Sequence, residues 1–132
     1  MLLSEEELIK IRRHLHQIPE LALHEEQTHD YLLQVIKSFN QDHLEIRVAP
    51  ELPTALFVLV KGTNPQRTLG YRTDIDALPV EEQTGLPYRS QHPGVMHACG
   101  HDIHMTVALG VLNYFAEHQP KDNLLFFFQP AE

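Results

Sequence analysis

A chain of 132 residues can bury one core of ordinary domain size but cannot hold two complete domains. Its 18 acidic residues outnumber its 10 lysines and arginines, and the basic residues form no run or stripe, which argues against nucleic acid and membrane partners. The acidic start MLLSEEELIK, the single cysteine and the absence of a long apolar run lead us to expect a cytoplasmic protein.

The first predicted elements are two amphipathic helices. The stretch SEEELIKIRRHLHQIPE (4–20) has Ser4 and Glu7 at the spacing of a capping box, an apolar stripe behind them, and Pro19 to end the helix. A second helix is predicted over 25–39, again from apolar residues that recur on one face. Both helices therefore need a partner that covers their apolar sides.

Three strand-like runs follow the helices. They cover 44–49, 54–60 and 68–74, and the Pro, Gly and Asn residues between them suit turns. The first two runs could form a hairpin. The chain then becomes irregular over 77–95, and a long loop of this kind in a compact domain tends to be functional, so we expect it to form part of a site.

A helix over 102–118 and a strand over 123–129 complete the predicted elements. The strand contains five consecutive apolar residues, which indicates burial on both faces. Together with the run at 68–74, this helix and strand make a crossover unit that joins parallel strands. The sequence thus predicts an α/β fold with a mixed, partly parallel sheet and flanking helices.

Polar side chains gather where this topology brings strand ends together. Asp74 and Asp76 stand at the carboxyl end of one predicted strand, and Glu132 stands at the carboxyl end of another. The segment from Cys99 to Asp102 lies at the start of the helix between them. Because sites in α/β sheets lie beyond the carboxyl ends of the strands, we expect these groups to meet at one edge.

The residue types at this edge suit a metal ion. Cys99 and His101 flank Gly100, so a tight bend could direct a thiolate and an imidazole at the same ion. Asp102, or an aspartate of RTDIDALP, could accept a hydrogen bond from a ligand imidazole. Glu132 is positioned to take a proton from an activated water and to pass it to a leaving amine.

Other interpretations of the same residues stay open. Cys99 could be a buried small hydrophobe, or a nucleophile with His101 or His104 as its base. His97 could support the bend or contact a substrate. The remaining candidates are solvated or structural histidines rather than ligands: His14, His16, His24, His29, His43 and His118.

Four stretches in this order and spacing resemble a known family: RRHLHQIPEL, YRTDIDALPVEEQTGLPYRS, MHACGHDIHM and FFFQPAE. They are similar to the cysteine-containing branch of the M20 metallopeptidase/amidohydrolase family, over essentially the whole chain. The resemblance implies that residues 1–132 are the N-terminal part of the catalytic domain. It implies two divalent metal ions (zinc, manganese or cobalt), with Cys99 and His101 as metal ligands, Glu132 as the catalytic base and Asp76 as the residue that orients the site.

The same resemblance implies a substrate and a larger protein. The sequence is most similar to family members that remove the acetyl group of N-acetyl-LL-2,6-diaminopimelate, a step toward lysine. The alternative is a related hippurate-type or other N-acyl-amino-acid amidohydrolase. In the family, further ligands and a dimerisation domain lie beyond the position of Glu132, so we expect this chain to be a fragment of an enzyme that acts on small N-acylated amino acids as a homodimer. An inactive fragment that binds metal or a partner chain is the alternative.

Overall fold

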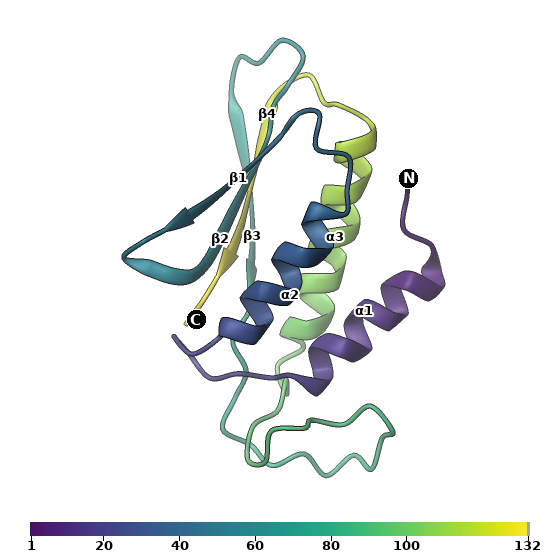
Figure 1. The fold of residues 1–132 in the computed structure, drawn as a ribbon, viewed down its shortest axis with the longest axis vertical. Helices are drawn as coiled ribbons and strands as arrows, with labels where there is room; N and C mark the ends of the chain where they lie inside the picture. The colour runs from purple at the N-terminus through teal and green to yellow at the C-terminus, as the bar shows by residue number, and fades with distance from the viewer. Residues whose placement is uncertain (132) are drawn as a thin grey trace.

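The computed structural model describes residues 1–131 and contains the elements expected from the sequence, in the expected order (Figure 1). Ser4 caps the first helix with the predicted capping box, in which Ser4 and Glu7 bond each other's backbone amides. The bounds of the elements are α1 Glu5–Gln17, α2 Glu26–Lys37, β1 Leu44–Ala49, β2 Leu52–Val60, β3 Thr68–Asp74, α3 His101–Glu117 and β4 Asn123–Gln129.

The four strands form one mixed sheet in the order β1-β2-β4-β3. β1 and β2 make the expected antiparallel hairpin, and β2 is also antiparallel to β4. β3 and β4 are parallel and are joined through α3, as the crossover prediction required. The predicted α/β class with a partly parallel sheet is therefore confirmed.

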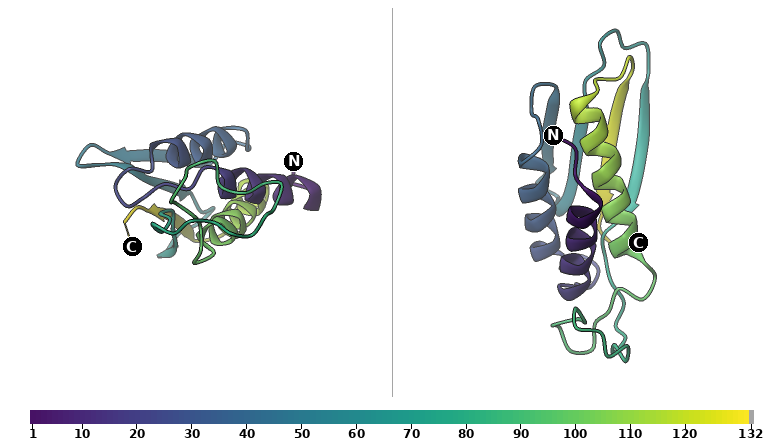
Figure 2. Two further views of the ribbon diagram at one scale, coloured as in Figure 1. Left: turned by 90° about the horizontal axis from the view of Figure 1, so that it is seen from below. Right: turned by 90° about the vertical axis from the view of Figure 1, so that its right-hand side faces the viewer.

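The core lies between one face of the sheet and the helices, which gather on that face (Figure 2). Phe126 and Phe128 of β4 and Leu56 and Val58 of β2 point into it and are almost fully buried. Phe127, between the two buried phenylalanines, lies on the other face and remains half-buried, stacked on a β2 side chain. The prediction that β4 is buried on both faces is therefore wrong for the described chain, because helices cover only one face.

One edge of the sheet collects chain segments that are distant in sequence. The carboxyl ends of β3 and β4 lie near the start of α2, and the connection between α1 and α2 passes beside them (Figure 1). Ile75 N–H donates to the carbonyl of Gln129 at 3.0 Å, and Ala77 N–H donates to the carbonyl of Glu20 at 2.7 Å. The backbone after each of the two strands is thereby fixed. None of the helices described is long and apolar enough to cross a membrane.

Candidate metal centre

His101 and Asp76 meet at this edge, as expected from their sequence positions. His101, the first residue of α3, is buried, and its Nδ1 lies 2.8 Å from the backbone carbonyl oxygen of Asp76. A carbonyl can only accept, so Nδ1 is a donor here, which leaves Nε2 as the ring nitrogen that could bind a metal. The Asp76 carboxylate also lies 3.3 Å from Nδ1. This is the arrangement by which proteins orient a ligand imidazole.

The bend before α3 is also present. Gly100 is the N-cap residue of α3 and has φ +85°, a left-handed conformation that costs glycine nothing and strains other residues. Its carbonyl accepts hydrogen bonds from the amides of Ile103 and His104. Cys99, on the other side of the bend, is exposed rather than buried. The interpretation of Cys99 as a buried small hydrophobe is therefore wrong.

The other candidates at this edge have different surroundings. Asp74 forms an exposed ion pair with Arg72 at 2.7 Å. His104 is exposed, and its ring centroid lies 5.9 Å from that of His101, so the two rings lie on the same face of α3. Glu132, the predicted base, lies outside the described residues. The structure thus joins Asp76 to His101, while Cys99 precedes His101 by two residues in the chain.

Asp102 is turned away from this edge and belongs to a buried charge network. Its Oδ2 lies 2.8 Å from Nδ1 of His16 and 3.0 Å from Nε of Arg12. Nε2 of His16 lies 3.0 Å from the Glu82 carboxylate. Because both carboxylates can only accept, a doubly protonated His16 satisfies both. The network ties α1 to the start of α3 and to the long loop.

Two of the histidines expected to be solvated or structural are buried, which is the structural alternative. His16 is almost fully buried in the network, and His29 is buried with its Nδ1 3.1 Å from the carbonyl of Thr54. Both remain structural rather than ligating in the described chain. The signal for His16 was its place four residues after Arg12, which puts both cations on one face of α1, beside the apolar stripe.

His97 is a buried histidine of another kind. It is 4% exposed, and neither ring nitrogen has a hydrogen-bond partner among residues 1–131. Burial lowers the pKa of His97 to about 4; nearby Asp102 opposes this shift, and the cations around it add to it. The ring is therefore neutral at physiological pH. Both interpretations of His97, support of the bend and contact with a substrate, stay open.

The shifted pKa of His97 predicts an acid-labile fold in metal-free protein. Folded His97 stays neutral down to about pH 4, whereas in the unfolded chain it takes up a proton near pH 6.5, its ordinary pKa. The unfolded state therefore binds more protons in this window, and stability falls as the pH is lowered from 6.5 to 4, by on the order of 3 kcal/mol. Urea denaturation at pH 7 and pH 5 should show about 2 kcal/mol of this loss in the wild type and a smaller loss in His97→Phe. Equal losses would contradict the prediction.

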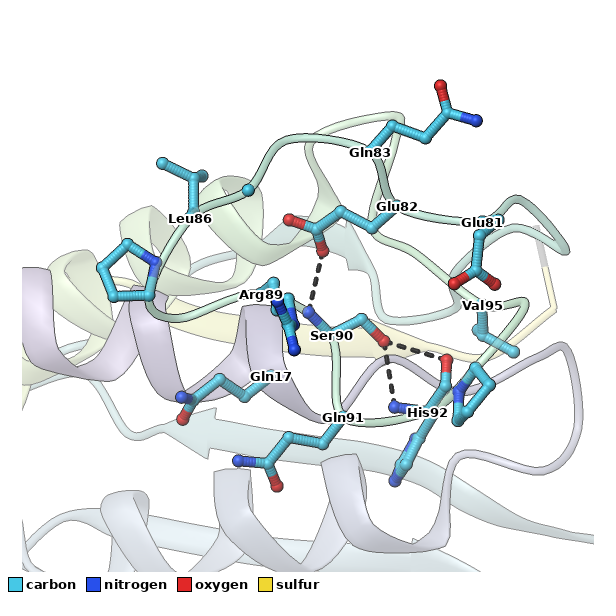
Figure 3. A pocket seen from close by; sticks show the side chains of 13 residues that line it. Gln17, Glu81, Glu82, Gln83, Leu86, Arg89, Ser90, Gln91, His92 and Val95 are labelled. Carbon is cyan, nitrogen blue, oxygen red and sulfur yellow. Dashed lines mark hydrogen bonds between the residues drawn. The ribbon is translucent and has the colours of Figure 1, made fainter.

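The long loop surrounds a polar pocket of about 850 Å³ (Figure 3). Glu82 anchors the loop by accepting from the amide of Ser90 at 2.8 Å, and the Ser90 hydroxyl donates to the carbonyl of His92. Burial opposes the charge of Glu82, but bonds from Thr84, Ser90 and His16 together hold its pKa below the usual value. Neither Asp76, Cys99 nor His101 lines this pocket, so the hollow and the candidate metal ligands are separate features.

The donor chemistry at the sheet edge fits part of a metal site. A thiol beside a helix start and an oriented imidazole are typical ligands of zinc and similar ions. Within residues 1–131, no three His, Cys, Asp or Glu side chains are arranged to share an ion.

Comparison with known proteins yields close relatives. Residues 70–132 match the family described as Peptidase family M20/M25/M40. The chain is 79% identical over 131 residues, 99% of its length, to N-acetyldiaminopimelate deacetylase of Limosilactobacillus reuteri (strain DSM 20016). It is 75% identical over 98% of its length to the deacetylase of the same name from Lactobacillus helveticus (strain DPC 4571). In each case the chain spans 34% of the relative's length.

Solved structures show the same architecture. The Bacillus subtilis YXEP protein, described as a dinuclear metal-binding peptidase from the M20 family, superposes with a TM-score of 0.89 at 38% identity. The match covers 95% of this chain and 35% of that one. An aminohydrolase from methicillin-resistant Staphylococcus aureus superposes with a TM-score of 0.88 at 39% identity, over 97% of this chain and 34% of the other.

Proposed function

Because this chain belongs to peptidase family M20/M25/M40, we propose that the intact protein is a metal-dependent amide hydrolase that deacetylates N-acetyl-LL-2,6-diaminopimelate. The products are LL-2,6-diaminopimelate and acetate, in a step toward lysine. The 79% identity to a protein named for this deacetylation supports the choice of substrate over other N-acyl amino acids. Residues 1–132 form the N-terminal part of the catalytic domain in this proposal.

The observation that carries the proposal is the orientation of His101. Its Nδ1–H is held by the carbonyl of Asp76, which presents Nε2 in the form that ligates metals. Cys99, on the other side of Gly100, supplies a thiolate from an exposed position at a helix start. We assign both residues as ligands of a pair of divalent ions. Such ions, when bound, polarise the amide carbonyl and lower the pKa of an attacking water.

The chain's own residues transfer the proton and orient the ligand side chain. Glu132 accepts the proton of the attacking water and transfers it to the departing amine as the C–N bond breaks, so the amino group leaves neutral. Asp76 keeps the His101 ring from rotating through its carbonyl and its carboxylate. The apolar core behind α3 and β4 holds both segments rigidly.

We also propose a substrate class, a compartment and an oligomeric state for the intact protein. The intact protein acts on a small N-acylated amino acid in the cytoplasm, and it forms a homodimer through a domain outside this chain.

Chelation of the full-length protein tests the proposed function. We expect wild-type enzyme to release acetate from N-acetyl-LL-2,6-diaminopimelate, to lose this activity after exhaustive chelation, and to regain it with zinc, manganese or cobalt. The apoprotein refilled with magnesium serves as a control, because a thiolate ligand disfavours that ion. Full activity in metal-free protein, with an acyl–thioester on Cys99 detected by mass spectrometry, would instead establish the thiol mechanism. No acetate release under any condition would overturn both.

A further inference from the structure

Glu25, the residue before α2, is a fully buried carboxylate that the proposed chemistry does not use. No ion pair reaches it within the described chain, although burying a carboxylate without a countercharge is costly. Both of its oxygens instead accept hydrogen bonds. Oε1 accepts from the Thr54 hydroxyl at 3.0 Å, and Oε2 accepts from the backbone N–H of Ala131 at 2.9 Å.

The second of these bonds reaches a strained point of the backbone. Ala131 has φ +54°, in the left-handed region that an alanine rarely adopts. A residue in this conformation persists only where its surroundings hold it, and such residues cluster at functional sites. Ala131 is also the residue directly before Glu132 in the chain.

The backbone on the other side of this point is fixed as well. The carbonyl of Gln129, the last residue of β4, accepts a hydrogen bond from the N–H of Ile75 at 3.0 Å. The ring of Pro130, the next residue in the chain, fixes the φ angle of that residue. The strained residue thus lies between the end of a strand and a buried carboxylate from a different element. α2 is in turn anchored by Glu20, whose carboxylate accepts from the amides of Gln27 and Thr28.

We propose that Glu25 is a positioning residue for Glu132. The hydrogen bond from Ala131 N–H to Glu25 holds the left-handed backbone of Ala131, the residue before the proposed base, so the residue N-terminal to α2 as well as β4 fixes the chain at that point. The role of Glu132 in this inference rests on the proposed function, whereas the bond between Glu25 and Ala131 does not. Thr54 provides the matched comparison, because it shares the same buried carboxylate but has no link to Ala131 in the described hydrogen bonds.

The test uses three variants of the full-length, metal-loaded enzyme. Glu25→Ala should lower kcat by about 10- to 100-fold, the cost of misplacing a catalytic group by a fraction of an ångström to an ångström, while KM and bound metal stay near wild type. Glu25→Gln should restore much of kcat, because its amide oxygen can still accept from Ala131 N–H and its NH₂ can donate to the Thr54 hydroxyl. Thr54→Val, which removes only the Oε1 bond, should lose stability but keep kcat.

Two outcomes would overturn the inference. One is an unchanged kcat in Glu25→Ala. The other is a loss of kcat in Thr54→Val as large as that in Glu25→Ala, which would make Glu25 a purely structural residue. Hydrogen exchange of the Ala131 amide, followed by NMR on alanine-labelled protein, distinguishes a failure of this inference from a failure of the proposed function. Even if the wild type is inactive on the acetylated substrate, Glu25→Ala should accelerate this exchange and Thr54→Val should not; equal exchange in all variants would remove the basis of the inference.

Discussion

Replacing His101 by alanine in the full-length protein is expected to remove bound metal and to lower deacetylase activity by at least about 10³-fold, because a lost ligand forfeits several kcal/mol of transition-state stabilisation. The imidazole is buried and its orientation is fixed by the carbonyl of Asp76, so no nearby group can take over its position without a backbone shift. Metal content measured by mass spectrometry and kcat/KM for acetate release provide two independent readouts.

The control for this prediction is His118→Ala at the other end of the same helix. His118 is exposed, and its contacts among residues 1–131 are a hydrogen bond to the carbonyl of Tyr114 and stacking on the Tyr114 ring, so its loss should leave metal content and kcat/KM unchanged. His101→Ala with full metal loading would contradict the ligand assignment. Lost activity with retained metal would point instead to a role in the thiol mechanism, in which His101 is the base.

A second large effect is expected at Asp102, which lies in the buried network rather than at the metal edge. Asp102→Ala should lower the free energy of unfolding by about 3–5 kcal/mol, because it leaves the buried His16 without the countercharge that α3 supplies. Arg12, which also contacts Asp102, can turn toward solvent and adds less. Asp102→Asn keeps an oxygen acceptor for His16, so its free energy of unfolding should lie between those of the wild type and Asp102→Ala. Equilibrium denaturation by urea measures all of these differences.

Asp74→Ala is the matched control for this experiment. It removes the same side chain from an ion pair whose arginine is 54% exposed, and it should cost no more than about 1 kcal/mol. A similar loss of stability in the two variants would mean that the buried network contributes no more than a surface pair. It would also mean that α1 is held against α3 by its apolar contacts alone.

The order of the elements and the gathering of the site residues were predictable from local patterns. Helices α1 and α2 followed from apolar periodicity and capping, and the parallel pairing of β3 with β4 followed from the helix between them. Once that crossover was assigned, geometry required Asp76 and the start of α3 to lie at one edge. The left-handed bend at Gly100 was likewise predictable, because glycine tolerates that conformation.

The surroundings of individual polar groups were decided by tertiary structure. Whether Asp102 faces His101 or His16 depends on how α1 packs against α3, and no local pattern encodes that angle. The half-buried state of Phe127 likewise depends on which face of the sheet is covered. Glu25 looked like an ordinary acid at a helix start, although it precedes Thr28 and Leu32 by three and seven residues and so lies on the buried face.

The sequence by itself therefore determined the elements, their connection and the chemistry available at one edge of the sheet, because periodicity, capping and residue type act over a few neighbouring positions. Only the tertiary structure decided which buried charges pair, which histidine is neutral, and which carboxylate holds the backbone before Glu132. Those outcomes depend on the free-energy cost of desolvation and on the stabilisation from contacts between distant segments, such as those of Glu25 and Ala131. Both contributions arise only when the chain has folded.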